Sequence, residues 1–264
     1  MTNSFIKYKN IISELARKNI RTQYRGSVLG FLWTILNPLL TMLVMWIVFS
    51  QFFGKDDPYY PIYLLAGNIL FTALRNATSQ SLTSIYNNRG LLLRTKVEPY
   101  IFPCSYVVSN LVNFLLSLLA LVPFMIWLSI AQGLNLFTFR LLFIFLMLPA
   151  FWLFQYGIGL FLSVLYVFVK DILHLYTVFL VLWNYITPIF YKPIEGNEFV
   201  NFVINATPMY YFVTYFRDSV YSGSVTNTIP SWTTLAILYG FGILSFLIGY
   251  GVYRLSEENI CMKL

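Results

Sequence analysis

A polar stretch, Arg75-Asn-Ala-Thr-Ser-Gln-Ser81, interrupts an otherwise apolar run of the chain. A charge and several amides and hydroxyls are costly in lipid, so such residues usually face the interior of a helix bundle or a water-filled path. The guanidinium of Arg75 is suited to a lipid phosphate or to a group on a second copy of the chain. A structural alternative stays open, in which the hydroxyls bond neighbouring helices and Arg75 reaches a carbonyl or the membrane surface.

Residues for acid–base or nucleophilic catalysis are sparse. The acidic residues are scattered, with no Asp-x-Asp pair, and the only histidine, His174, has no cysteine or histidine near it in the sequence. A multi-span membrane glycosyltransferase or acyltransferase, the main alternative class, requires a carboxylate pair, a metal site or a nucleophile with its base. We therefore predict no catalytic residue and no metal site.

The composition indicates a chain that is surrounded by lipid. Hydrophobic residues make up 58%, aromatic residues 19% and charged residues 10% of its 264 residues. The net charge of +7 is distributed along the chain as expected for membrane topology, and it does not form a patch for nucleic acid. We therefore expect an integral membrane protein with no nucleic-acid partner.

The fold class that we predict is an all-α membrane bundle with six transmembrane helices. An amphipathic helix in the first 30 residues lies in the membrane interface, residues 31–253 form the bundle, and residues 254–264 form a cytoplasmic tail. Short re-entrant helices on the outer face are predicted between Lys192 and Thr228. The six predicted spans are Phe31–Phe53, Pro58–Leu74 continuing past Arg75, Cys104–Ile130, Leu141–Val169, His174–Tyr191 and Ser231–Tyr253.

Basic residues give the orientation of these spans. Twelve of them fall on the side of the N-terminus and four on the opposite side, with Arg75 inside a span. This bias predicts that both ends of the chain are cytoplasmic, and that the four outer residues are Lys55, Arg140, Lys192 and Arg217.

Four motifs occur in order along nearly the whole chain. The first runs from Tyr24-Arg25-Gly26-Ser27 through Gly30 and Trp33 to Asn37-Pro38. The others are Val169-Lys-Asp-Ile172, Ile186-Thr-Pro-Ile-Phe-Tyr191 and Asn205-Ala-Thr-Pro-Met-Tyr210. In this set the chain resembles the ABC-2 type permeases that export polysaccharides, although many relatives have the Asn and Pro of the last motif adjacent.

The resemblance implies an ATP-driven exporter of a lipid-linked polysaccharide, such as O-antigen, capsule or teichoic acid, in the bacterial cell membrane. Two copies of the permease pair with two copies of a separate ATPase subunit, which binds the ATP and Mg. This chain binds no cofactor, and its only Gly-Lys pair, Gly54-Lys55, is followed by Asp56 and so lacks the phosphate-binding motif. An ABC-2 permease for a small lipid or a drug is the alternative within the same fold.

Two cytoplasmic loops are candidates for contact with the ATPase. The first, between spans two and three, combines a turn with an apolar and basic run, which favours a short amphipathic coupling helix. The alternative is a solvated basic turn, but exposed leucines usually have a partner. The residues that we predict for coupling are Asn87, Arg89, Gly90, Leu91, Leu92, Leu93, Arg94 and Lys96 in the first loop, and Lys170 and Asp171 in the second.

Aromatic residues are dense on the first and fifth spans. Their flat rings can stack on sugar rings and so provide a surface along which a polymer slides, although many of the aromatics in the chain belong to interfacial belts. The resemblance implies that these two spans line the path. With Arg75, the predicted path residues are Trp33, Trp46, Phe49, Trp183, Tyr185 and Tyr191.

Overall fold

The computed structural model describes residues 2–53, 59–95, 97–132, 139–191, 198–220 and 230–263. All regular elements in these ranges are helical. They are α1 (Thr2–Gln23), η1 (Gly30–Leu32), α2 (Trp33–Phe53), α3 (Tyr60–Asn87), α4 (Arg89–Leu92), α5 (Ile101–Ser117), η2 (Leu118–Ala120), α6 (Leu121–Gln132), η3 (Phe139–Leu142), α7 (Phe143–Phe168), α8 (Ile172–Ile186), α9 (Glu198–Asn205), α10 (Pro208–Val220) and α11 (Trp232–Lys263).

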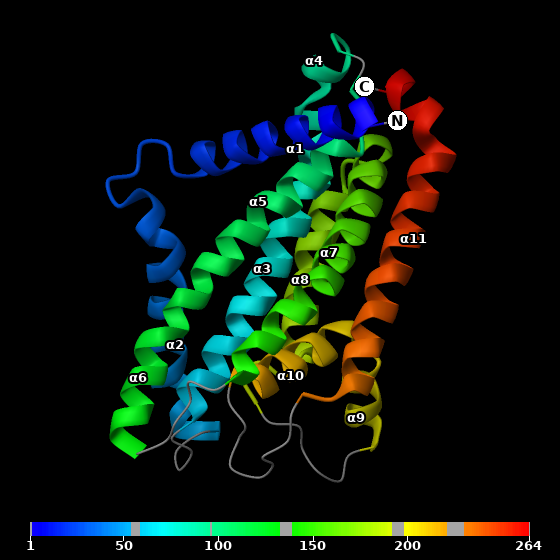
Figure 1. The fold of residues 1–264 in the computed structure, drawn as a ribbon. Helices are drawn as coiled ribbons and strands as arrows, with labels where there is room; N and C mark the ends of the chain where they lie inside the picture. The colour runs from blue at the N-terminus through cyan, green and yellow to red at the C-terminus, as the bar shows by residue number, and fades with distance from the viewer. Residues whose placement is uncertain are drawn as a thin grey trace.

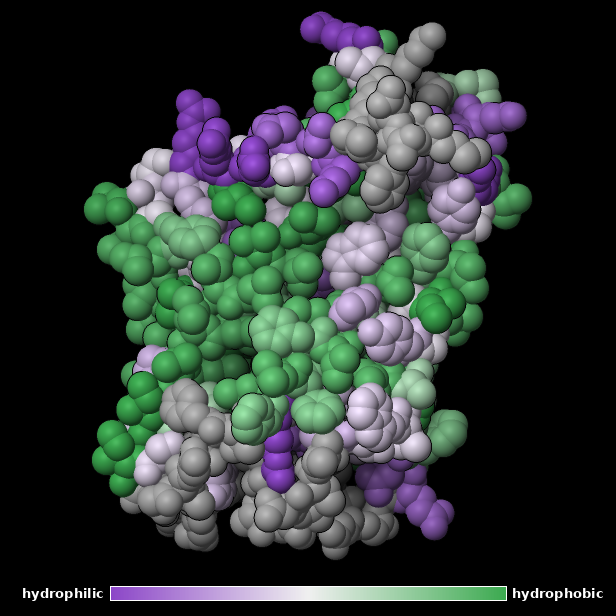
Figure 2. All heavy atoms as spheres, viewed as in Figure 1, coloured by the Kyte–Doolittle hydropathy of each residue, from purple (hydrophilic) through white to green (hydrophobic). Residues whose placement is uncertain are grey.

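The long helices run alongside one another in a single bundle (Figure 1). Four segments are long and apolar enough to cross a membrane, namely Gly30–Phe49, Ile101–Trp127, Phe139–Phe168 and Trp232–Ile260. Helix α3 is more polar and α8 is shorter, but both run along the same bundle. A broad hydrophobic band crosses the middle of the face seen in Figure 2, and the coarse prediction of an all-α membrane protein is confirmed.

Helix α1 crosses one end of the bundle, where the N-terminus, the C-terminus and α4 also lie (Figure 1). Ala16 is buried and Ile12 packs against the core, while Glu14, Arg17 and Lys18 are exposed. The amphipathic pattern thus gives a helix whose apolar face lies on the bundle, chiefly on α5.

An elbow joins α1 to α2. Gly26 and Gly30 have φ angles of +83° and +45°, in the left-handed region that favours glycine. The hydroxyl of Ser27 accepts a hydrogen bond from the Gly30 amide at 3.1 Å. The predicted entry motif therefore forms the turn that redirects the chain from the end of the bundle into α2.

A seam of small residues joins α7 to α11. A Cβ atom on Gly249 would overlap the carbonyl of Gly157, and one on Gly242 would lie 2.7 Å from the carbonyl oxygen of Ala150. The hydroxyl of Ser245 donates to the Phe154 carbonyl oxygen at 3.0 Å. Small residues let the two backbones approach this closely, as is common between helices in membranes.

Several boundaries differ from the prediction. Helix α3 continues through the polar stretch to Asn87, because Thr78, Ser81 and Ser84 are buried with their hydroxyls bonded to the backbone. The third predicted span contains the short 3₁₀ segment η2. Helix α11 passes the predicted end at Tyr253 and reaches Lys263, so the described part of the tail is helical.

Candidate functional site

A polar slot of about 410 Å³ lies between α2, α3 and α5, beneath the elbow. Helix α3 contributes Asn68, Thr72, Arg75 and Asn76. These positions share one face of the helix, because residues four or seven apart in an α-helix lie above one another. Arg75 is near the middle of α3. The side chain of Arg75 therefore lines a cavity within the bundle.

Helices α2 and α5 form the other walls of the slot. Trp33, Asn37 and Thr41 follow one face of α2, and Asn110 and Asn113 follow one face of α5. The α5 amides are buried and bonded: Asn110 donates to Gln80 Oε1 at 2.8 Å, and Asn113 donates to Gln23 Oε1 at 2.9 Å. One wall is therefore fixed by a hydrogen-bond network.

The entry motif forms the upper rim and part of the α2 wall. The Tyr24 hydroxyl lies 3.4 Å from both Thr34 Oγ1 and Asn113 Oδ1. Pro38 cannot donate a backbone hydrogen bond to the carbonyl of Thr34, and the hydroxyl of Ser117 bonds that carbonyl at 3.1 Å instead. Both ends of the motif thus line the slot, whereas Arg25 is exposed and is not among the lining residues.

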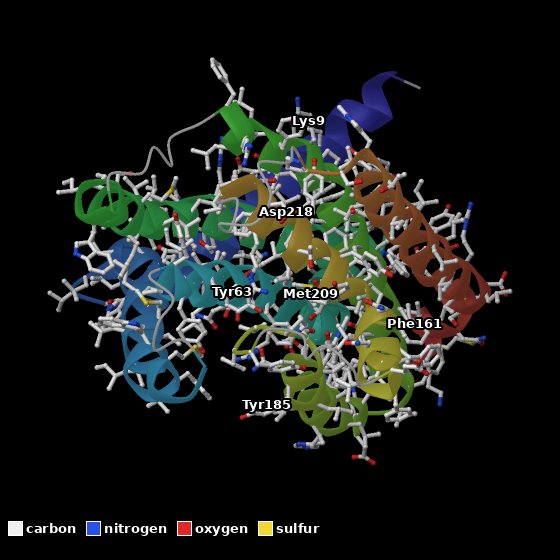
Figure 3. The ribbon with its side chains drawn as sticks, turned by 90° about the horizontal axis from the view of Figure 1, so that it is seen from below. Lys9, Tyr63, Phe161, Tyr185, Met209 and Asp218 are labelled. Atoms are coloured by element: carbon white, nitrogen blue, oxygen red, sulfur yellow. The ribbon has the colours of Figure 1, made fainter. Side chains whose placement is uncertain are left out.

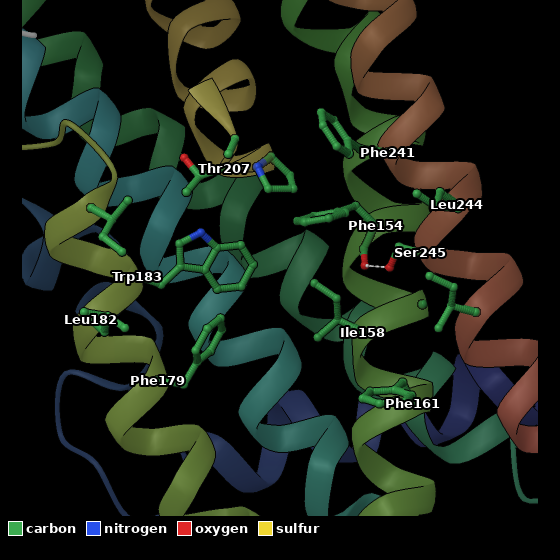
Figure 4. Close-up of a pocket in the computed structure, with 15 residues that line it drawn as sticks. Phe154, Ile158, Phe161, Phe179, Leu182, Trp183, Thr207, Phe241, Leu244 and Ser245 are labelled. Carbon is green, nitrogen blue, oxygen red and sulfur yellow. Dashed lines mark hydrogen bonds between the residues drawn. The ribbon is translucent and has the colours of Figure 1, made fainter. Parts of the chain in front are cut away.

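A second cavity, the apolar groove, lies between α7, α8 and α11 and measures about 440 Å³. Figure 4 shows Phe154 and Ile158 from α7, Trp183 from α8 and Leu244 from α11 around it. Trp183 is only 7% exposed, and its ring packs at right angles or tilted against Phe71, Phe154 and Phe179.

The predicted path residues separate into groups. Trp33 and Arg75 line the polar slot, and Trp183 lines the apolar groove. Phe49 and Tyr185 join an aromatic cluster around Phe190, with ring centroids 5.2 and 6.0 Å away.

Tyr191 contacts the same end of α8, because its hydroxyl donates to the carbonyls of Tyr185 and Ile186, each at 3.1 Å. Trp46 is exposed on α2 and lines neither cavity. Within one chain, the predicted aromatic residues therefore do not line a single cavity. Their contact with a glycan stays a prediction.

The two predicted coupling loops meet at Tyr86. Arg89 lies over its ring with the guanidinium carbon 4.5 Å from the centroid, and Lys170 lies over it at 3.0 Å. Lys170 is also 4.4 Å from the centroid of Tyr166, and burial beside these rings, with Arg89 nearby, lowers its pKa. The loops therefore form one surface.

Leucines of this surface point in different directions. Leu91 and Leu93 are 40% and 67% exposed, whereas Leu92 packs against the core. Arg94, Asn87, Gly90 and Asp171 are exposed as well. Lys96 lies outside the described residues. A helix forms in the loop as expected, but α4 has only four residues.

Arg217 was counted as an outer charge from the sequence, and the structure shows that it is a buried structural residue. It is 7% exposed, and its guanidinium donates to the carbonyl oxygens of Tyr63, Pro188 and Ile189. We call this arrangement, together with Tyr60, the outer latch, because the Tyr60 hydroxyl donates to the Phe190 carbonyl at 2.6 Å.

The latch fastens α10 across the end of the bundle opposite α1. In the end-on view of Figure 3, α10 crosses the centre near Tyr63, while Tyr185 lies towards the edge on α8. Met209 and Phe212 on α10 are fully buried. Short helices were predicted before the last span, and the described part of residues 192–228 contains α9 and α10. Their re-entrant character in a membrane is untested.

Sequence reasoning missed most of the slot and the latch. Asn68, Asn110, Asn113 and Asn184 are single amides in apolar runs of three different helices. Among them, only the spacing of Asn110 and Asn113 indicates a shared helix face. Within the described ranges, no group of three His, Cys, Asp or Glu side chains could hold a metal ion.

The sequence of this bundle matches a known family of membrane proteins. The family model described as "ABC-2 type transporter" matches residues 11–221, so the chain belongs to that family. It is 27% identical over 239 residues to the O-antigen export system permease protein RfbA of Myxococcus xanthus, which covers 90% of each chain.

Two further relatives have related names. A Klebsiella pneumoniae O-antigen export system permease protein RfbA is 22% identical over 251 residues, covering 93% of this chain and 91% of the relative. The polysialic acid transport protein KpsM of Escherichia coli is 29% identical over 99 residues, 37% of this chain and 38% of its own length. Two of these names describe O-antigen export, and the third describes polysialic acid transport.

Proposed function

We propose that this chain is the permease subunit of an ATP-driven exporter that moves a lipid-linked polysaccharide out of the cytoplasm. The observation that carries the proposal is the end-to-end similarity to O-antigen export permeases, which spans nine-tenths of both proteins. A small-lipid or drug permease would share the fold, but the names of the relatives favour a polymer. A membrane glycosyltransferase is not favoured, because the family is one of transporters.

The proposed topology has six crossings, made by α2, α3, the α5–α6 segment, α7, α8 and α11. The two ends of the chain lie at the same end of the bundle, which agrees with an even number of crossings (Figure 1). The basic residues favour a cytoplasmic position for that end. The proposed assembly contains two copies of this chain and two ATPase subunits, and the ATPases bind ATP and Mg.

Deletion of the gene in its host tests the function directly. We expect loss of one glycan from the cell surface and accumulation of its lipid-linked form inside, both reversed by the wild-type gene. Unchanged surface glycans, with an altered efflux of a small lipid or drug, would overturn the proposal in favour of the alternative permease.

Labelling of single cysteines tests the topology. Ser4→Cys, Asn197→Cys and Ser256→Cys are made in a background without Cys104 and Cys261, and intact cells are treated with an impermeant thiol reagent. Only position 197 is expected to react. Reaction at position 4 or 256 from outside would contradict the cytoplasmic ends.

Docking of the ATPase is tested at the exposed leucines. Replacing Leu91 and Leu93 by Ser should reduce the ATPase that co-purifies with the chain by at least tenfold, because two apolar contacts are lost from the interface. The matched variant Leu92→Ser changes the core side of the same helix. It should lower folded yield instead. Full co-purification by the double variant would exclude this surface as the docking site.

A further inference from the structure

The polar slot contains amides without partners. Asn37, Asn68, Asn76 and Asn184 all line it, and none of their side chains forms a hydrogen bond with another residue in the described ranges. Asn37 is exposed and the other three are half-buried, so their amide groups are open to the cavity. An asparagine offers two donors and one acceptor, and leaving them unbonded away from water costs free energy. Four such side chains around one cavity therefore call for a polar occupant with many hydroxyl-type groups.

The slot is deep as well as polar. Along α2 its lining runs from Trp33 to Met45, about 18 Å at 1.5 Å per residue. On α8 it reaches Asn184, near the end of that helix opposite α1. An occupant can thus remain in contact with amides over much of the length of the bundle.

Arg75 is the only charged side chain among the described residues that line the slot. It is exposed to the cavity, and its guanidinium lies 5.4 Å from the Phe71 ring centroid. The guanidinium forms no hydrogen bond or ion pair with residues in the described part of the chain. A guanidinium with free donors binds phosphate through two parallel hydrogen bonds.

The charge pattern discriminates between two kinds of glycan. A polyanion with a carboxylate on its successive sugars would need a cation for each one it brings into the slot, since an unpaired buried charge is costly. Neutral amides match the donors and acceptors of sugar hydroxyls without that cost. A single arginine matches a single phosphate-bearing linkage.

We infer that the slot binds a neutral, hydroxyl-rich glycan segment next to one phosphate linkage, with the amides on the hydroxyls and Arg75 on the phosphate. This inference rests on the proposed export of a lipid-linked glycan and specifies which class of glycan it is. The phosphate chemistry fits either the linkage of the glycan or the headgroup of an ordinary phospholipid, and the test separates the two.

The test measures binding to the complex of this chain with its ATPase in phospholipid nanodiscs. The first probe is a neutral hexose tetrasaccharide joined by diphosphate to a farnesyl chain. The second carries a carboxylate on alternate sugars, and the third is farnesyl diphosphate alone. We expect the neutral probe to bind at least tenfold more tightly than either of the others.

Variants assign that binding to the slot. Arg75→Gln should weaken the neutral probe at least tenfold, and the double variant Asn68→Ala with Asn184→Ala should weaken it several-fold. Asn205→Ala changes an exposed amide on α9 that is not among the residues lining the slot; it is the matched control and should leave binding unchanged. A thermal melt of each variant verifies that the fold is retained.

The possible outcomes separate the inference from the proposed function. Equal binding of the acidic and neutral probes, or full binding by the asparagine double variant, would overturn the inference while leaving polymer export intact. Loss of probe binding when the nanodisc phospholipid is made anionic would assign Arg75 to bulk headgroups and overturn it as well. If none of the glycan probes bound or stimulated ATP hydrolysis and a small lipid did, the proposed function itself would fail.

Discussion

The polar slot and the apolar groove have similar volumes, about 410 and 440 Å³, but opposite chemistry and different walls. The groove is bounded by α7 and α11, whose backbones touch along the glycine seam. The slot is bounded on one side by α2, on which Met42 is the only buried side chain among those described. One cavity thus lies beside a tightly packed pair of helices, and the other lies behind a helix that makes few contacts.

This difference indicates which helix can move. Displacing α11 from α7 would break close backbone packing. Displacing α2 would break few contacts, because most of its described side chains already face outwards. The elbow at Gly26 and Gly30 supplies a turn at the base of α2. The contrast therefore predicts large stability effects at the seam and the groove and small ones in the slot.

The largest effect is expected at the seam. Gly249→Leu places a side chain against the Gly157 backbone, which cannot move aside, so we expect the loss of most folded protein in detergent. Gly251→Leu is the matched control two residues along the same helix, because its position opens into free space. Equal yields of the two variants by size-exclusion chromatography would mean that the seam does not hold the bundle.

Neighbouring residues on α8 allow the cavities to be compared directly. Trp183→Ala should lower the free energy of unfolding by up to about 3 kcal/mol. This value is at the low end for the loss of a large buried ring, because a membrane bundle is surrounded by hydrocarbon rather than by water. Asn184→Ala should leave the melting temperature unchanged and reduce glycan export. Export lost in proportion to folded protein in both variants would remove the distinction.

A smaller loss is expected at the outer latch. Arg217→Gln removes charge-assisted bonds to three backbone carbonyls and should cost about 2 kcal/mol. Arg254→Met, which breaks an exposed pair with Glu257, should change the melting temperature little. Similar melting temperatures for both variants would show that the latch contributes nothing to stability.

The sequence predicted the elements better than it predicted the site. Long apolar runs identified the regions of α2, α7 and α11, because a run of that length has few other structures available. The two interpretations left open for the Arg75–Ser81 stretch each apply to part of it: Arg75 and Asn76 line the slot, whereas the hydroxyls of Thr78 and Ser81 bond backbone carbonyls. The sequence did not predict where α3 and α11 end. The polar residues of α3 continue the helix because a hydroxyl such as that of Thr78 bonds the helix's own backbone. The last turns of α11 are charged, and the helix nevertheless continues to Lys263.

The remaining slot and latch residues depend on tertiary structure. Asn68 and Asn184 are separated by more than a hundred residues, and only the packing of α3, α2 and α8 brings them to one cavity. For Arg217, the sequence shows only a charged residue between the fifth and sixth predicted spans. It does not show that the guanidinium bonds one carbonyl of α3, that of Tyr63, and two carbonyls in the segment after α8, those of Pro188 and Ile189.

Arg75 also bears on the ion gradients of the membrane. A route wide and polar enough for a hydrated polymer is a potential leak for sodium ions and protons. A fixed positive charge midway along α3 repels cations in a region of low dielectric, as arginines do in water-conducting pores. In the proposed export route, the side chain that would receive an anionic linkage would therefore also oppose the passage of cations when no glycan is present.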